Sequence, residues 1–147
     1  MAILKKAAFI LSLFGLIVLS PLLIIIFLIN FLVCRSPLLF QERIGLNKKI
    51  FILVKFRTMK LGTKNVATHL VDKRNITFFG NLLRSLKLDE LPQLWNVLVG
   101  DMSIVGPRPC LLNQNDLINE RTKKNVFKVR PGITGLAQVK GITMSNP

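Results

Sequence analysis

Hydrophobic and polar positions divide the chain into two unequal parts. From Ala7 to Val33 no side chain is ionisable. This run is too long for a signal peptide, and no small-residue cleavage site follows it. About 20 consecutive apolar residues suffice to cross a bilayer. Residues 1–34 are therefore predicted to form a membrane-inserted helix, and residues 35–147, where apolar, basic and polar positions mix, a separate domain.

A proline in the middle of the apolar run indicates a break in this helix. Pro21 removes a backbone donor, and in lipid the carbonyl that it frees needs a partner, which the Ser20 hydroxyl or nearby backbone can supply. Both flanks are also basic, which favours keeping both ends on the cytoplasmic face. The residues alone leave a re-entrant helix and a kinked span as equal alternatives. The basic flanking residues are Lys5, Lys6, Arg35, Arg43, Lys48 and Lys49.

Beyond residue 35 the pattern changes to short elements. Residues 38–40 and 50–59 predict two strands of a β-hairpin, because turn residues 45–47 separate them and the second run is rich in β-branched and aromatic side chains. The polar residues 61–75, which include His69, predict a loop.

The rest of the chain reads mainly as helix. Apolar spacing predicts helices over residues 76–88, 89–100 and 111–128, and residues 107–109, Pro-Arg-Pro, predict an extended rigid segment between the last two. The expected fold class is α+β: a re-entrant membrane helix followed by a small, mainly helical catalytic domain with a short β-hairpin.

Charge and cysteine content narrow the function classes. Lys and Arg number 21 against 7 Asp and Glu, giving a net charge of +14. This excess attracts polyanions, and beside a membrane segment it favours anionic lipid and phosphorylated substrates over nucleic acid. Cys34, Cys110 and the single His69 have no zinc-ligand spacing, so free thiols are expected.

Two adjacent carboxylates, Asp89 and Glu90, are the candidate catalytic centre, because Leu88 and Leu91 flank them and set them apart from an acidic surface. As the expected N-cap of the helix over residues 89–100, Asp89 would lie in the field of the helix amides, which favours an ionised nucleophile. An N-cap is among the commonest uses of aspartate, and the pair taken by itself favours that structural role. Cations from separate segments strengthen the catalytic alternative, and carboxylates can also hold Mg²⁺ between phosphates. These cations are Lys55, Arg57, Arg84 and Arg108.

Longer motifs carry a resemblance to a known family. QERIGL (41–46), KFRTM (55–59), LDELPQLWNVLVGDMSIVGPRP (88–109) and RPGITGLAQVKG (130–141) resemble the bacterial sugar transferases, the monotopic polyprenyl-phosphate phosphoglycosyltransferases. The resemblance covers nearly the whole chain and includes the Ser20-Pro21 break of that family's re-entrant helix.

The resemblance implies a two-step reaction. Asp89 matches the nucleophile that attacks the β-phosphate of a UDP-sugar and releases UMP, after which polyprenyl phosphate takes the phosphosugar from the enzyme. Glu90 matches the second member of the dyad, assisting with Mg²⁺ or proton handling. Lys55, Arg84 and Arg108 match family positions around the phosphates and nucleotide, with Pro107 and Pro109 shaping that wall. Arg57 is a further candidate for binding the substrate, because alternate side chains of a strand share a face and it follows Lys55 by two positions.

The resemblance further implies an enzyme of the bacterial inner membrane with its catalytic domain on the cytoplasmic face and other glycan-assembly enzymes as further partners. Two positions and the length depart from the family pattern. Phe9 stands where an aspartate is usual and Ser36 where a glycine is usual, and members normally continue for several tens of residues beyond residue 141. A basic membrane-anchored module without enzymatic activity and an inactive shortened family member are the alternatives.

Overall fold

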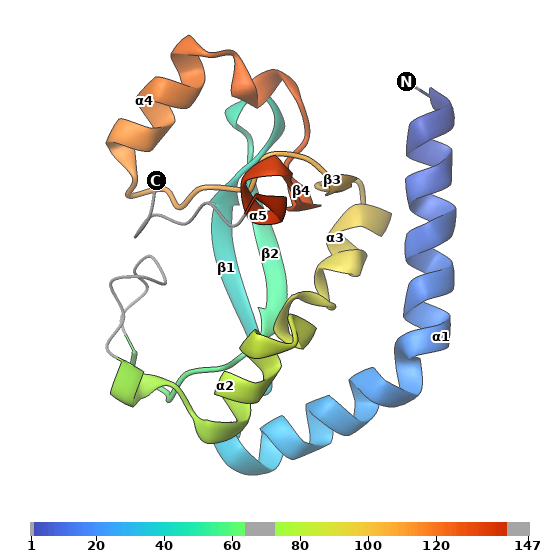
Figure 1. Ribbon diagram of the computed structural model, residues 1–147, viewed down its shortest axis with the longest axis vertical. Helices are drawn as coiled ribbons and strands as arrows, with labels where there is room; N and C mark the ends of the chain where they lie inside the picture. Colours follow the sequence, from blue (N-terminus) through green and yellow to red (C-terminus); the bar gives the residue numbers. More distant parts are fainter. Residues whose placement is uncertain (1, 64–72, 141–147) are drawn as a thin grey trace.

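The computed structural model describes residues 2–63 and 73–140. Its first element is the helix α1 (Ala2–Cys34), which bends about midway along its length (Figure 1). Pro21 lies inside the helix, and the Ser20 hydroxyl donates a 2.7 Å hydrogen bond to the Ile17 carbonyl. Ile17 is the residue four positions before Pro21, so its carbonyl is the one that the proline leaves without a donor. The predicted local compensation at Ser20 is therefore confirmed.

Both limbs of α1, residues 2–20 and 21–34, pack on the same small domain. Ala8 in the first limb packs against a core cluster of Phe51, Leu53, Val97 and Met102. Ile26 in the second limb belongs to another cluster with Phe56 and Leu83. Most large apolar side chains of α1 are nevertheless exposed, and Lys6–Cys34 is long and apolar enough to cross a membrane.

The hairpin expected from the sequence is present. Strands β1 (Leu38–Ile44) and β2 (Ile50–Phe56) pair antiparallel, with Leu39 opposite Lys55 and Phe40 opposite Val54. The turn uses Gly45 and the short 3₁₀ helix η1 (Leu46–Lys48), in which Asn47 and Lys48 have positive φ. The first strand is longer than predicted, and the second ends earlier.

A single amide covers the outer edge of β2. Asn96 Oδ1 accepts from the Val54 amide at 3.0 Å, and Asn96 Nδ2 donates to the Ile52 carbonyl at 2.7 Å. These are the backbone groups that a third strand would pair with. The Asn96 side chain thus completes the hairpin and ties it to the helix α3 (Gln93–Leu98).

The segment between the hairpin and α3 holds two short helical elements. After η3 (Lys73–Asn75), helix α2 (Phe78–Ser85) begins at Thr77, whose hydroxyl caps the Gly80 amide at 2.9 Å. The 3₁₀ helix η4 (Leu88–Glu90) follows Lys87, whose φ is +59°. The prediction of one helix over residues 89–100 with Asp89 as its N-cap is wrong, since α3 begins only after Pro92 and has no side-chain cap.

The C-terminal part adds a parallel strand pair that the sequence did not reveal. Strands β3 (Ser103–Val105) and β4 (Gly132–Thr134) run side by side. A Cβ on Gly132 would lie 2.1 Å from the Gly106 nitrogen, so glycine is required at this contact. The predicted helix over residues 111–128 is shorter, consisting of α4 (Asn115–Lys123) and η5 (Val126–Lys128), and α5 (Leu136–Val139) ends the described chain.

Candidate active site

The carboxylate pair is buried at the centre of the domain. Asp89 is 7% exposed and Glu90 is 9% exposed, and both belong to η4, between α2 and α3. Leu88, just before them, packs on the cluster of Ile26, Phe56 and Leu83. This packing fixes the turn, so both carboxylates are held on a well-anchored backbone. Carboxylates are seldom buried so deeply without charged partners.

Two cations face Asp89 from different elements. Lys55 comes from β2 and Arg84 from the last turn of α2, and both act on the charge of Asp89. The Arg84 Nε donates a 2.8 Å hydrogen bond to the Thr58 hydroxyl, which orients its guanidinium. The structure therefore brings together three residues that the sequence singled out separately.

Lys55 holds an ammonium in a poorly solvated place. Burial, and secondarily the nearby Arg43 charge, lower the pKa of Lys55 to about 8, while Asp89 acts in the opposite direction. Within the part of the chain that the structure describes, Asp89 acts on this ammonium through its charge, with no hydrogen bond or ion pair between the two side chains. A buried cation with unused donors is suited to bind an anionic ligand such as a phosphate.

The ionisation of Asp89 differs from what a helix N-terminus would give. Burial, followed by the adjacent Glu90 charge, raises the pKa of Asp89 above its ordinary value. Lys55, Arg84 and the backbone amide of Asp89 itself oppose this rise. The ionised carboxylate is therefore stabilised by two side-chain cations instead of by the amides of α3, which corrects the electrostatic origin expected from the sequence.

Glu90 is paired with the Pro-Arg-Pro segment. Arg108 Nη2 donates to Glu90 Oε1 at 2.6 Å, with the Glu90 side chain 12% and the Arg108 side chain 49% exposed. One face of the guanidinium thus remains open to solvent while the other neutralises the buried carboxylate. Because the ion pair is half-buried, it is screened less than a surface pair.

Hydrogen bonds to all three carbonyls of the Pro-Arg-Pro segment hold it in place. The Pro107 carbonyl accepts from the Gly132 amide at 3.0 Å, and the Arg108 carbonyl accepts from the Arg121 guanidinium. The Pro109 carbonyl accepts from Arg43 at 3.1 Å. Since Pro107 and Pro109 lack amide donors, these acceptor contacts from separate elements fix the segment that carries Arg108.

Arg43 is a site residue that the sequence analysis counted only as a membrane-flanking charge. Its guanidinium also donates to the Gln41 side chain, and burial, together with the Arg108 charge, lowers its pKa to about 10. Its position in β1, opposite Phe51, was beyond the predicted end of the first strand. Extending the predicted first strand to Ile44 would have placed Gln41 and Arg43 on the same face, and this was the signal in the sequence that could have identified Arg43.

Arg57 lies elsewhere. Its guanidinium donates to the carbonyls of Ser36 at 3.0 Å and Leu38 at 3.4 Å. The fully buried Asn30 of α1 completes this junction by donating to the Pro37 and Arg57 carbonyls at 2.8 and 2.7 Å. The structure thus uses Arg57 to join α1 to the hairpin and does not bring it to the carboxylate pair.

The remaining titratable candidates add little to the site. Cys34 and Cys110 are free and buried, as expected. Among residues 2–63 and 73–140 no three His, Cys, Asp or Glu side chains gather at a point where they could hold a metal. The adjacent Asp89 and Glu90 supply the two hard oxygen ligands that suffice for Mg²⁺ when substrate phosphates and water complete its shell. His69 lies outside the described residues.

Comparison with known proteins shows to which family this chain belongs. The model of the family described as "Bacterial sugar transferase" matches residues 2–146. The chain belongs to this family.

Individual proteins that are similar to this sugar transferase carry names consistent with the family. It is 47% identical over 107 residues to the uncharacterized sugar transferase EpsL of Bacillus subtilis, covering 72% of this chain and 52% of EpsL. It is 41% identical over 150 residues to an undecaprenyl-phosphate glucose phosphotransferase of Komagataeibacter xylinus, covering 94% and 28% of the two chains. A UDP-glucose:undecaprenyl-phosphate glucose-1-phosphate transferase of Klebsiella pneumoniae is 39% identical over 131 residues, covering 86% and 28%. The sugar transferase thus spans about half or less of these relatives.

Proposed function

We propose that this sugar transferase moves a phosphosugar from a UDP-sugar onto a polyprenyl phosphate, with Asp89 as the nucleophile. The observation that supports this most directly is that Lys55 and Arg84, two cations from different elements, lie near enough to the buried Asp89 carboxylate for both to act on its charge. A nucleophile that attacks a phosphate needs cations to lower the repulsion between two anions. The names of the Klebsiella and Komagataeibacter relatives supply the donor and acceptor classes.

The proposed reaction has two displacements at phosphorus. In the first, a carboxylate oxygen of Asp89 forms a bond to the β-phosphorus of the UDP-sugar, and the bond from that phosphorus to the bridging oxygen breaks, releasing UMP. In the second, an oxygen of polyprenyl phosphate attacks the same phosphorus, and the Asp89 carboxylate leaves. The product is a polyprenyl-diphosphate sugar, and the enzyme returns to its starting state.

The other charged groups have distinct parts in this proposal. Lys55 and Arg84 hold the phosphate oxygens and stabilise the charge that develops at phosphorus. Glu90, neutralised on one side by Arg108, would hold Mg²⁺ together with Asp89. When bound, Mg²⁺ would neutralise the diphosphate. Pro107 and Pro109 shape the wall that presents Arg108.

We also propose that α1 is re-entrant, with both of its ends at the cytoplasmic face of the inner membrane. A helix of 33 residues is about 50 Å long, well above the roughly 30 Å of a bilayer core. Ala8 and Ile26, on opposite sides of the Pro21 bend, both pack on the one domain that follows. A straight span would separate its two ends across the membrane, so these contacts favour a helix that turns back.

The decisive experiment is UMP release from a panel of UDP-sugars with Mg²⁺ and undecaprenyl phosphate. We expect release by the parent protein and a loss of about 10⁴-fold or more with Asp89→Asn, because an amide cannot act as the nucleophile. Asp116→Asn, on the exposed surface of α4, is the matched control and should retain full activity. Equal release from the parent and Asp89→Asn would disprove the role of Asp89.

A covalent intermediate gives an independent test. Without acceptor, the parent protein should gain the mass of one phosphosugar and lose it again on addition of undecaprenyl phosphate. Polyanion binding that falls steeply with salt, together with no UMP release from any UDP-sugar, would instead indicate a basic membrane-anchored module.

A further inference from the structure

Thr58, the second residue after β2, contacts both ends of α2. Its carbonyl accepts a hydrogen bond from the Thr77 amide at 3.1 Å, just before the first turn of the helix. Its hydroxyl accepts from the Nε of Arg84 at 2.8 Å, in the last turn. Thr58 is 3% exposed, so neither contact competes with bulk water. One buried residue therefore fixes how α2 lies against the end of the hairpin.

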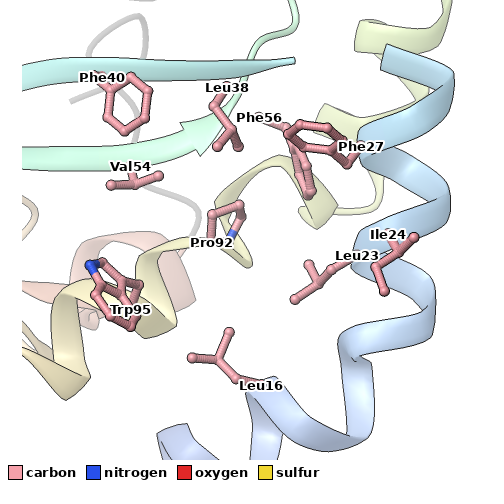
Figure 2. A pocket seen from close by; sticks show the side chains of 10 residues that line it. All are labelled: Leu16, Leu23, Ile24, Phe27, Leu38, Phe40, Val54, Phe56, Pro92 and Trp95. Carbon is pink, nitrogen blue, oxygen red and sulfur yellow. The ribbon is translucent and has the colours of Figure 1, made fainter. Parts of the chain in front are cut away.

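A glycine and an apolar contact keep α2 close to Thr58. A Cβ on Gly80 would lie 2.7 Å from the Thr58 Cα and closer still to its carbonyl oxygen, so any larger residue would push the helix away. Leu83 packs in one cluster with Phe56, the last residue of β2. Figure 2 shows Phe56 at the wall of an apolar cavity of about 470 Å³, which α1, the hairpin and α3 border. Polar and apolar contacts together thus hold α2 at the end of β2.

The anchored guanidinium of Arg84 keeps two nitrogens for a ligand. Thr58 takes up the Nε, and within residues 2–63 and 73–140 neither terminal nitrogen has a hydrogen-bond or ion-pair partner. A guanidinium is planar, so a bond at Nε restricts the direction in which the edge formed by Nη1 and Nη2 points. That edge matches two oxygens of a phosphate. Arg84 and Asp89 also act on each other's charge, so the guanidinium belongs to the charged site.

We infer that Thr58 is a positioning residue, whose hydroxyl holds the Arg84 guanidinium in the orientation that binds the β-phosphate of the UDP-sugar. The inference rests on the proposed function, in which Asp89 attacks the phosphorus of that phosphate. It adds that the orientation of Arg84 matters as well as its charge. If Thr58 served the fold alone, its hydroxyl would contribute to stability and to nothing that the substrate senses.

Removing the hydroxyl alone tests this role. Thr58→Val keeps the shape of the side chain, and Thr58→Ser keeps the hydroxyl. We expect kcat/KM for UMP release to fall about tenfold in Thr58→Val, because a small misplacement of a positioning group costs up to about 10²-fold. Thr58→Ser should stay within about twofold of the parent, and a Thr58→Ser variant as impaired as Thr58→Val would overturn the role of the hydroxyl. Thr122→Val, the same change at an exposed position of α4, is the control and should have no effect.

A double-mutant cycle separates positioning from stability. Arg84→Met removes the guanidinium and should lower kcat/KM about 10²-fold or more. Without the guanidinium the hydroxyl has nothing to orient, so adding Thr58→Val to Arg84→Met should cause no further loss. A loss of packing or stability would persist in both backgrounds. Losses from the two substitutions that multiply independently would therefore contradict the inference.

Binding of UDP gives a readout that does not depend on turnover. Calorimetric titration of the protein in detergent with Mg²⁺ and either UDP or UMP compares a ligand that has the β-phosphate with one that lacks it. Thr58→Val should weaken UDP binding about fivefold and leave UMP binding unchanged. Thr58→Ser should bind both nucleotides like the parent.

The outcomes distinguish the inference from the proposed reaction. Weaker UDP binding in Thr58→Val that Thr58→Ser restores, together with no UMP release by the parent, would keep the role of Thr58 and reject the reaction. UMP release by the parent with the same UDP affinity in Thr58→Val would keep the reaction and reject the role of Thr58. A parent protein that neither binds UDP nor releases UMP would overturn both.

Discussion

The two faces of the β1–β2 hairpin differ in polarity: one contacts charged groups and the other borders an apolar cavity. On one face Lys55 lies among Arg43, Arg84, Arg108 and Asp89, and most of these groups are buried or held by a hydrogen bond. On the other face Phe40, Val54 and Phe56 border an apolar cavity. The difference indicates that side-chain alternation along a two-stranded hairpin can place a cluster of charged groups on one face and an apolar surface on the other.

Removing the central cation of the charged face should have the largest effect. Lys55→Met keeps the length of the side chain and its apolar contacts but deletes the ammonium beside Asp89. We expect UMP release to fall about 10²- to 10³-fold, which is typical for loss of one donor that stabilises developing charge. The measurement is kcat/KM for the UDP-sugar. Lys49→Met, an exposed change at the hairpin turn, is the control and should have no effect.

Removing the hydrogen bonds between Asn96 and strand β2 should lower the stability of the domain. Asn96→Leu removes the buried amide that pairs with the Val54 amide and the Ile52 carbonyl, so both backbone groups lose their partner. Each lost hydrogen bond contributes about 0.5–1.5 kcal/mol, so the free energy of unfolding should fall by about 1–3 kcal/mol. Chemical denaturation in detergent measures it. A loss as small as that of the exposed Asn119→Leu on α4 would contradict the role of Asn96.

The dependence of UMP release on pH should reflect the pKa shifts that burial causes at Lys55 and Asp89. The pKa of Lys55 is lowered to about 8, so its charge is present below that pH and is lost as the pH rises through it. The kcat/KM for UMP release should then fall about tenfold per pH unit above 8. The acid limb should lie above the ordinary range of aspartate, because burial raises the pKa of Asp89. Lys55→Arg should move the alkaline limb upward, and an unmoved limb would assign it to another group.

The smallest effect is expected at the bend that supports the apolar face. Pro21→Ala restores the backbone donor to the Ile17 carbonyl and should partly straighten α1. We expect a few-fold loss of activity and a fraction of chains with residue 6 moved across the membrane. Labelling of a single Lys6→Cys reporter in a background without Cys34 and Cys110 measures that fraction. Full labelling from the cytoplasmic side in both proteins would indicate that the bend is held by the domain instead of by Pro21.

Local features of the molecule were the most predictable. The Ser20-Pro21 break and the hairpin turn after Gly45 both follow from short segments whose physics is local. The family motifs pointed to Asp89, Lys55 and Arg84 together, and the structure places the two cations near enough to act on the charge of Asp89, while their catalytic roles stay predictions.

Features that depend on distant partners could not be predicted. Arg57 looked like a phosphate ligand because it follows Lys55 by two positions, yet its donors go to carbonyls at the end of α1. The pairing of β3 with β4 joins segments nearly 30 residues apart and depends on the contact between Gly106 and Gly132. Asp89 resembled a helix cap because Pro92 fits a first helical turn, but the chain forms a separate 3₁₀ turn before it. In each case a tertiary contact overrides a local preference.

The bend of α1 has a consequence for how the protein is made. Its determinants, Pro21 and the bond from Ser20 to Ile17, lie within five consecutive residues and need nothing from the domain. The helix can therefore take its bent shape as soon as it emerges from the ribosome, before residues 35–147 are synthesised. The hairpin, α2 and α3 then fold against a template already in place at the membrane, and the charged site is completed only when the last segments of the domain arrive.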